Sequence, residues 1–241
     1  MNLAKEILEQ IDWFQYRDEL NPKIWDGDHL KSTVRIKLLE IVDKFVEFVK
    51  LPASVQIVQK IFTGSMCTYA YTQFSDLDTH VIIDIPRSNL LGGQPLKVAL
   101  NARKALWSLQ YHPEIFKYPV ELYLQDVNEQ FIGSGIYDLV EDKWLRHPEH
   151  ITNLHIDRYA IELKSKDLQE QIDAALKDGN EIQINDLKKK IRDFRKSGLE
   201  TGGEYSTENL AFKDLRNNGY LQKLAEYEKA LINRSLSYDE E

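Results

Sequence analysis

Cysteine and long apolar runs are what this sequence has least of. Cys67 is the only cysteine in 241 residues, which excludes an internal disulfide and a cysteine-rich zinc site and suits a reducing compartment. No stretch approaches the roughly 20 uninterrupted apolar residues of a membrane-spanning helix, and Met1 to Glu6 lack the apolar block of a signal peptide. We therefore expect a cytoplasmic protein that does not bind membranes.

Positive charge is also in the minority. The 31 Lys and Arg residues stand against 39 Asp and Glu residues, a formal net charge of −8. This balance disfavours a protein whose whole surface binds nucleic acid, because such binding neutralises phosphates with a basic face. A local basic strip lies within residues 188–196, interrupted by Asp193. We favour a solvated helix face over a binding strip there, because charge runs are commonly such faces.

The first two thirds of the chain combine helical and strand patterns. Apolar residues recur at helical spacing over 3–16 and 30–50, with Asp28 as a candidate N-cap of the second helix. Short β-branched and aromatic runs then predict three strands of one sheet, and a helical pattern precedes the third strand. The predicted strands span 55–62, 79–85 and 120–127, and the helix spans 95–111.

The last third is predicted to be helical, over 158–177, 184–196 and 207–231. Glycines at 198, 202 and 203 are expected to separate the last two of these helices. The sequence therefore predicts a mixed α/β or α+β fold, with a small mixed sheet flanked by helices. We expect a core with N-terminal helices over 1–150 and a helical C-terminal region over 151–241.

Two short motifs flank the first loop of the predicted sheet. Phe62-Thr63-Gly64-Ser65 ends the first strand, and Ser75-Asp76-Leu77-Asp78 opens the second. Glycine lets the backbone approach a phosphate, and a serine hydroxyl with the amides of a following helix can donate to phosphate oxygens. The two-residue period of a strand points Asp76 and Asp78 to one face. Paired carboxylates beside a phosphate-binding turn predict a Mg²⁺ site, with Mn²⁺ as the alternative.

A two-metal mechanism requires a third carboxylate. Glu121 is the lone acid of the apolar run from Tyr118 to Leu124, and an ionised side chain among apolar neighbours is costly unless it is paired. A metal ion would pair with it. Asp126 is the competing candidate, but it lies at the end of the run, so we favour Glu121.

This spacing of Gly-Ser, Asp-x-Asp and a later acid resembles the DNA polymerase β-like nucleotidyltransferase superfamily over about residues 57–125. The resemblance implies that Gly64 and Ser65 contact nucleotide phosphates and that Asp76 and Asp78 bind both metals. It further implies that Glu121 binds the catalytic metal and acts as a base. The third acid is often Asp in the superfamily, so Glu121 departs from its pattern.

A closer resemblance is to predicted nucleotidyltransferases encoded by large tailed bacteriophages, which implies a phage or bacterial setting. The segments that carry it are Leu20 to Gly27, Val120 to Tyr123 with Gly135 to Tyr137, and Gly203 to Ser206 with Leu215 to Asn217. Related enzymes hold the triphosphate with basic residues of a helical domain. By that analogy Lys213 and Arg216, three residues apart, are candidate nucleotide ligands, with surface ion pairing as the favoured alternative.

Three further side chains have two interpretations each. His80 shares a strand face with Asp78, so it either approaches the nucleotide or has the hydrogen-bonded packing role that is commoner for a strand histidine. Tyr69 and Tyr71, in the loop before the aspartates, either stack on a base or pack the loop.

The leading hypothesis is transfer of a nucleoside monophosphate from a nucleoside triphosphate to an acceptor hydroxyl, with release of pyrophosphate. RNA, a protein, a small molecule and another nucleotide stay open as the acceptor. The alternative is a catalytically silent module of the same fold that binds a nucleotide or a partner. The related hypothesis of pyrophosphate transfer to make alarmones is disfavoured, because the sequence around the site lacks the basic motifs of that family. A third hypothesis is that the chain is one half of a toxin–antitoxin pair, and no residue of the sequence argues for or against it.

Overall fold

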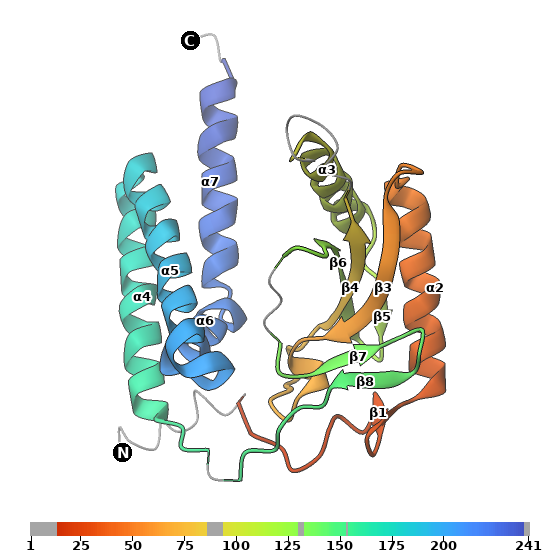
Figure 1. The fold of residues 1–241 in the computed structure, drawn as a ribbon. Coiled ribbons are helices and arrows are strands. Elements are labelled where there is room, and N and C mark those ends of the chain that lie inside the picture. Colours follow the sequence, from red (N-terminus) through yellow and green to blue (C-terminus); the bar gives the residue numbers. More distant parts are fainter. Residues whose placement is uncertain (1–13, 86–93, 130–132, 153, 239–241) are drawn as a thin grey trace. The chain divides into compact units, whose positions relative to one another are not determined.

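The structure, a computed structural model, describes residues 14–85, 94–129, 133–152 and 154–238 (Figure 1). These residues divide into two compact units, one within 13–152 and one within 153–241, and each has its own apolar cluster. The first unit contains the strands and the second contains helices alone among its described residues. The α+β class predicted from the sequence is confirmed. The helix predicted over 3–16 lies almost entirely outside the described residues.

A six-stranded mixed sheet forms the centre of the first unit, in the order β5-β6-β4-β3-β7-β8. β3 (Gln56–Thr63) is antiparallel to β4 (Leu77–Asp84), and β4 is parallel to β6 (Tyr118–Asp126). These are the three strands that the sequence predicts. The edges are completed by strands that it does not predict: β5 (Glu114–Ile115), β7 (Ile136–Asp138) and β8 (Lys143–Arg146).

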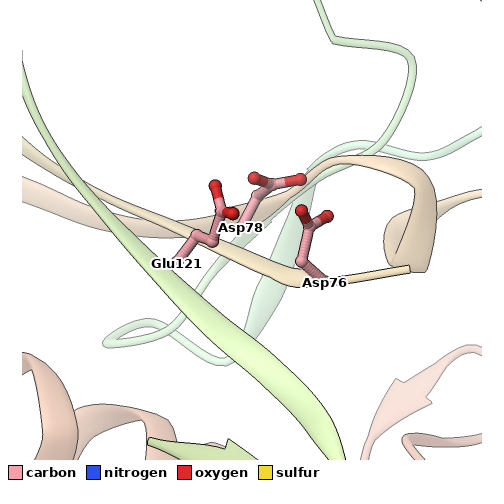
Figure 2. A group of neighbouring side chains, drawn as sticks. All are labelled: Asp76, Asp78 and Glu121. Carbon is pink, nitrogen blue, oxygen red and sulfur yellow. The ribbon is translucent and has the colours of Figure 1, made fainter. Parts of the chain in front are cut away.

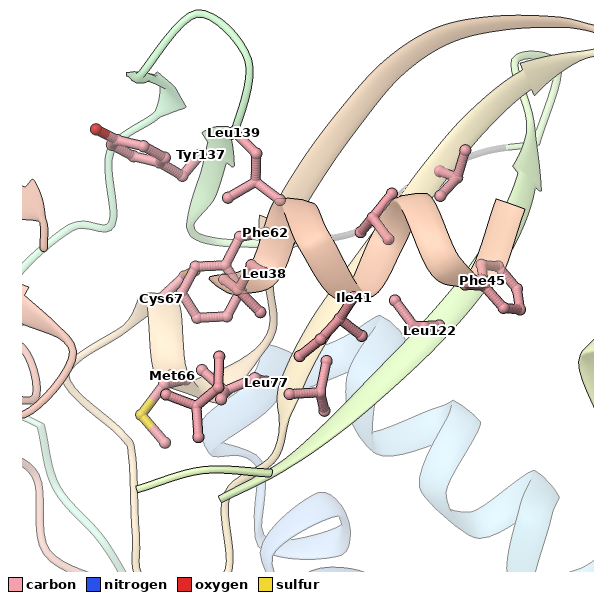
Figure 3. Packing of buried hydrophobic residues seen from close by; sticks show 14 of the residues in the cluster. Leu38, Ile41, Phe45, Phe62, Met66, Cys67, Leu77, Leu122, Tyr137 and Leu139 are labelled. Atoms are coloured by element: carbon pink, nitrogen blue, oxygen red, sulfur yellow. The ribbon is translucent and has the colours of Figure 1, made fainter. Parts of the chain in front are cut away.

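Two helices contribute to the core of this unit, α2 (Ser32–Val49) and α3 (Gln94–Gln110). Apolar residues at helical spacing give α2 one buried face, and Figure 3 shows Leu38 and Ile41 in the cluster that also holds Leu77. β4 alternates between buried and half-buried side chains, so its Leu77 face packs into this core. The opposite face of β4 is therefore the one that presents Asp78.

The start of α2 differs from the prediction. Its N-cap is Lys31, and the cap makes no side-chain hydrogen bond. The predicted N-cap, Asp28, lies between β1 (Trp25–Asp26) and β2 (His29–Leu30), which form a separate two-stranded sheet. This hairpin takes up the residues just before the helix, so α2 begins three residues later than Asp28 would require.

The second unit consists of helices packed around apolar side chains that include Ile172, Ile191 and Leu215. The side chains of Asp157 and Asn180 accept hydrogen bonds from backbone amides and so cap the helices α4 (Arg158–Asp178) and α5 (Glu181–Gly202). None of the helices in the described ranges is long and apolar enough to span a bilayer. The elements are α4 (Arg158–Asp178), α5 (Glu181–Gly202), η2 (Gly203–Tyr205), α6 (Thr207–Asn217) and α7 (Tyr220–Leu236).

Two of the predicted helices in this unit have wrong boundaries. α5 ends at Gly202 with Gly203 as its C-cap, so the predicted break at these two glycines is confirmed. It continues through Gly198, where a break is also predicted, because Gly198 is buried against α6 and a helix tolerates an isolated glycine. The predicted helix over 207–231 is two helices, α6 and α7. Gly219, with φ +77°, takes a left-handed conformation between them that a continuous helix does not allow.

Candidate metal centre

Asp76, Asp78 and Glu121 lie together in the structure. One possible ligand atom from each carboxylate lies within 4.8 Å of the others. Figure 2 shows the three side chains projecting to the same side of the strands. Glu121 follows the aspartates by more than 40 residues in the sequence, so the three side chains are brought together by the pairing of strands in the sheet.

The parallel pairing of β4 with β6 produces the cluster. Asp78 is the register partner of Glu121, so their side chains leave the sheet on the same face. Asp76 directly precedes β4, and the side chain of Leu77 is fully buried in the core. Because side chains alternate along a strand, the aspartates on either side of Leu77 face away from the core. Both aspartates are half-buried and Glu121 is exposed.

Carboxylate oxygens are the hard donors that Mg²⁺ and Mn²⁺ prefer, and Mg²⁺ in proteins is commonly held by one or two carboxylates together with substrate phosphates. Three carboxylates at this separation repel one another, and a divalent cation among them would offset that repulsion. The donor set therefore fits the ion expected from the sequence.

Gly64 brings backbone directly against the cluster. Its φ is +80°, and a Cβ atom built on it would lie 1.9 Å from Oδ2 of Asp78. Any other residue would be strained by that φ and would also collide with the carboxylate. The register explains the closeness, because Thr63, the residue before Gly64, is the partner of Asp78 in the β3–β4 pair.

Ser65 begins a single 3₁₀ turn, η1 (Ser65–Cys67), where the sequence suggests the start of a helix. The Ser65 hydroxyl is 2.8 Å from the hydroxyl of Ser75, which also accepts a hydrogen bond from the amide of Thr72. The Cys67 amide donates to the carbonyl of Gly64. Ser65 therefore ties the turn to the residue that precedes Asp76, and phosphate contact by Gly64 and Ser65 stays a prediction.

The environment of Glu121 corrects one part of the sequence argument. Glu121 is exposed, so it is not an ionised group enclosed by apolar neighbours, and desolvation is no reason for a metal to pair with it. Its position opposite Asp78 is the stronger reason. The competing Asp126 lies five residues farther along β6 and accepts hydrogen bonds from the amide and side chain of Asn128, as a turn residue does.

Tyr123 adds a group beside the cluster that the sequence argument missed. Its hydroxyl donates to Oε2 of Glu121 at 2.7 Å. Burial, this hydrogen bond and the negative charges of Glu121, Asp78 and Asp76 all raise the pKa of Tyr123, so the hydroxyl stays protonated. A tyrosine two positions after the acid, on the same strand face, was the signal available in the sequence.

His80 lies on the face of Asp78 but is held by protein groups. Its Nδ1 is hydrogen-bonded to Oε1 of Gln125 at 2.7 Å, and its ring lies 4.8 Å from the ring of Tyr123. Burial lowers the pKa of His80, more than the hydrogen bond to Gln125 raises it. These contacts are those of the packing interpretation.

The two tyrosines of the loop before the aspartates have different environments. Tyr69 is buried, and its ring packs edge-on against His150 at 4.7 Å, which supports loop packing. Tyr71 is half-buried, and the guanidinium of Arg17 lies 5.6 Å from its ring centroid.

The basic candidates belong to the helical unit. Lys213 is half-buried and Arg216 is exposed, both on α6. Their contact with a nucleotide stays a prediction. In the basic strip of α5, Lys188, Lys189 and Lys196 pair with Glu228, Asp193 and Glu200, as expected of a solvated helix face.

In comparisons with known proteins, no protein-family model, no curated protein and no solved structure matches this chain. The interpretation of the site therefore depends on the chemistry and geometry of its own residues.

Proposed function

We propose that this chain is a magnesium-dependent nucleotidyltransferase of the DNA polymerase β-like superfamily, acting in a bacterial cytoplasm and encoded by a phage or a bacterium. The observation that carries the proposal is the parallel register of Asp78 with Glu121, which completes a three-carboxylate cluster with Asp76. The backbone of Gly64 against Asp78 supports it, because a nucleotidyltransferase needs the triphosphate beside the metal ligands.

In the proposed reaction, a hydroxyl oxygen of the acceptor attacks the α-phosphorus of a nucleoside triphosphate and the bond to pyrophosphate breaks. Asp76, Asp78 and Glu121 would hold Mg²⁺, with Mn²⁺ as the alternative. When bound, the ion supplies neutralisation of the developing charge and polarisation of the phosphoryl oxygens. Glu121 accepts the proton of the attacking hydroxyl. Gly64 and Ser65 contact the phosphates, and Lys213 and Arg216 are further candidate ligands.

Transfer of label tests this proposal. The full chain is incubated with each α-labelled ribonucleoside triphosphate and Mg²⁺ or Mn²⁺, and pyrophosphate release and labelled products are followed. Asp78→Asn is the test variant. Asp84→Asn is its matched control, because Asp84 is an exposed acid of the same strand that does not belong to the cluster.

We expect the wild type and Asp84→Asn to release pyrophosphate and Asp78→Asn to lose at least 100-fold in rate, about the size of losing a key electrostatic contact. Nucleotide binding without turnover would instead favour a silent binding module. The absence of both pyrophosphate release and metal-dependent nucleotide binding would refute the proposal.

A further inference from the structure

Glu121 differs from the two aspartates in how its carboxylate is held. It is exposed, and a glutamate has one more side-chain torsion than an aspartate, so more freedom is lost when it is fixed in one geometry. Asp78, in contrast, is half-buried against the backbone of Gly64. A ligand set that includes Glu121 therefore requires something to hold that carboxylate.

The hydroxyl of Tyr123 is placed to do so. It donates to Oε2 of Glu121 at 2.7 Å, a short bond to a carboxylate. The two residues are two positions apart on β6, so their side chains leave the same face of the strand. The bond engages one oxygen of the carboxylate and restricts its rotation.

Tyr123 is in turn fixed by two neighbours. The ammonium group of Lys104, from α3, lies 4.0 Å from the centroid of the Tyr123 ring. On the neighbouring strand β4, the ring centroid of His80 lies 4.8 Å from that of Tyr123, and the His80 ring is itself hydrogen-bonded to Gln125. The donor is thus anchored to both a helix and a neighbouring strand, whereas its acceptor is exposed.

We propose that Tyr123 is a positioning residue that orients the Glu121 carboxylate toward Asp76 and Asp78 and thereby raises the affinity of the cluster for a divalent cation. This inference rests on the proposed function, because it assumes that the cluster binds a metal. Groups that hold metal ligands in place commonly contribute tenfold or more to metal affinity.

The test measures Mn²⁺ binding to the full chain by the paramagnetic resonance of the free ion, so neither a donor nor an acceptor has to be known. Tyr123→Phe keeps the ring and removes the hydroxyl. Tyr137→Phe is the matched control, because Tyr137 also donates to a carboxylate, Asp142, at 2.8 Å in the same unit. Asp78→Asn reports the loss of a ligand.

We expect Tyr123→Phe to weaken Mn²⁺ binding roughly tenfold and Tyr137→Phe to leave it unchanged. Repeating Tyr123→Phe in a Glu121→Gln background separates positioning from general damage, because two residues that act through one contact give non-additive effects. There the loss of the hydroxyl is expected to change the affinity less than twofold, a negligible step on this scale.

Two results would overturn the inference while the proposed function stands. One is unchanged Mn²⁺ binding by Tyr123→Phe while Asp78→Asn abolishes it. The other is an equal tenfold loss in the Glu121→Gln background, which would mean that Tyr123 acts independently of Glu121. A wild type that binds no Mn²⁺ would refute the metal site itself, and with it both the inference and the proposed function.

Discussion

Some backbone positions of the candidate site tolerate only glycine, and Gly64 is the clearest example. Its positive φ and its closeness to Asp78 are separate constraints, because the first concerns the residue's own conformation and the second its neighbour. Gly27 has the first constraint alone, since its φ is +56° and no atom lies within 4 Å of an added Cβ. The pair allows strain and collision to be measured separately.

We predict that Gly64→Ala and Gly27→Ala both lower the free energy of unfolding by about 1–3 kcal/mol, the usual cost of a strained backbone conformation. Gly64→Ala should also weaken Mn²⁺ binding roughly tenfold or more, because the new methyl group must displace the Asp78 carboxylate. Urea unfolding and Mn²⁺ titration measure the two effects. Equal Mn²⁺ affinity in both variants would contradict the predicted contact of Gly64 with Asp78.

The residues of the cluster are predictable to the extent that spacing defines them. Asp76, Leu77 and Asp78 follow from the two-residue period of a strand. Glu121 was selected as the lone acid of an apolar run, although its exposure shows that the desolvation argument behind that choice is wrong. What no spacing discloses is the register of β6 against β4, because pairing depends on the whole sheet. The spacing of Tyr123 from Glu121 on one strand could be seen in the sequence, but the hydrogen bond between their side chains could not.

At the scale of elements, three of the long helices were predictable and the shortest strands were not. α2, α3 and α4 begin and end within two residues of the predicted helices. Strands of two to four residues, such as β5, β7 and β8, are too short for an alternating pattern to be seen. Their positions depend on pairing with strands already in the sheet.

Gly198 shows how packing overrides a local signal. A Cβ on this residue would lie 2.5 Å from Cβ of Glu208 and 2.8 Å from Oγ of Ser206, at the start of α6. Ser206 is the N-cap of α6 and accepts from the amide of Asn209. Glycine here permits α5 to approach α6 closely, so it joins two helices rather than ending one.

We predict that Gly198→Ala destabilises the protein by about 1–3 kcal/mol, the range for overpacking a close contact. At an unconstrained helix position the same change would stabilise by roughly 0.5–1 kcal/mol, so the sign alone tests the contact. Ser197→Ala, at the exposed neighbouring position of α5, should change stability by no more than about 0.5 kcal/mol. Stabilisation by Gly198→Ala in thermal unfolding would contradict the close approach.

At the scale of the whole molecule, two separate apolar clusters follow the division into two units. Leu38 and Phe45 belong to the cluster of the sheet unit, whereas Ile172 and Leu215 belong to that of the helical unit. The candidate metal centre lies wholly within the sheet unit, and Lys213 and Arg216 lie wholly within the helical unit. A metal ion bound at the cluster is therefore expected to stabilise the sheet unit.

We predict that the two clusters unfold in separate thermal transitions. Leu38→Ala and Ile172→Ala each remove a fully buried side chain, at a cost of about 2–5 kcal/mol, so each should lower one transition by roughly 4 °C or more and leave the other unchanged. Mn²⁺ should raise only the transition that Leu38→Ala lowers, because a ligand stabilises the unit that binds it.

Differential scanning calorimetry of the full chain measures these shifts. Ile36→Ala and Ile182→Ala serve as controls, because both isoleucines are exposed on helices of the respective units. Neither control should move either transition by more than a fraction of the buried variants' shift. A single transition that both buried variants lower equally would mean that the two clusters form one cooperative unit, and Mn²⁺ would then stabilise the helical residues together with the sheet.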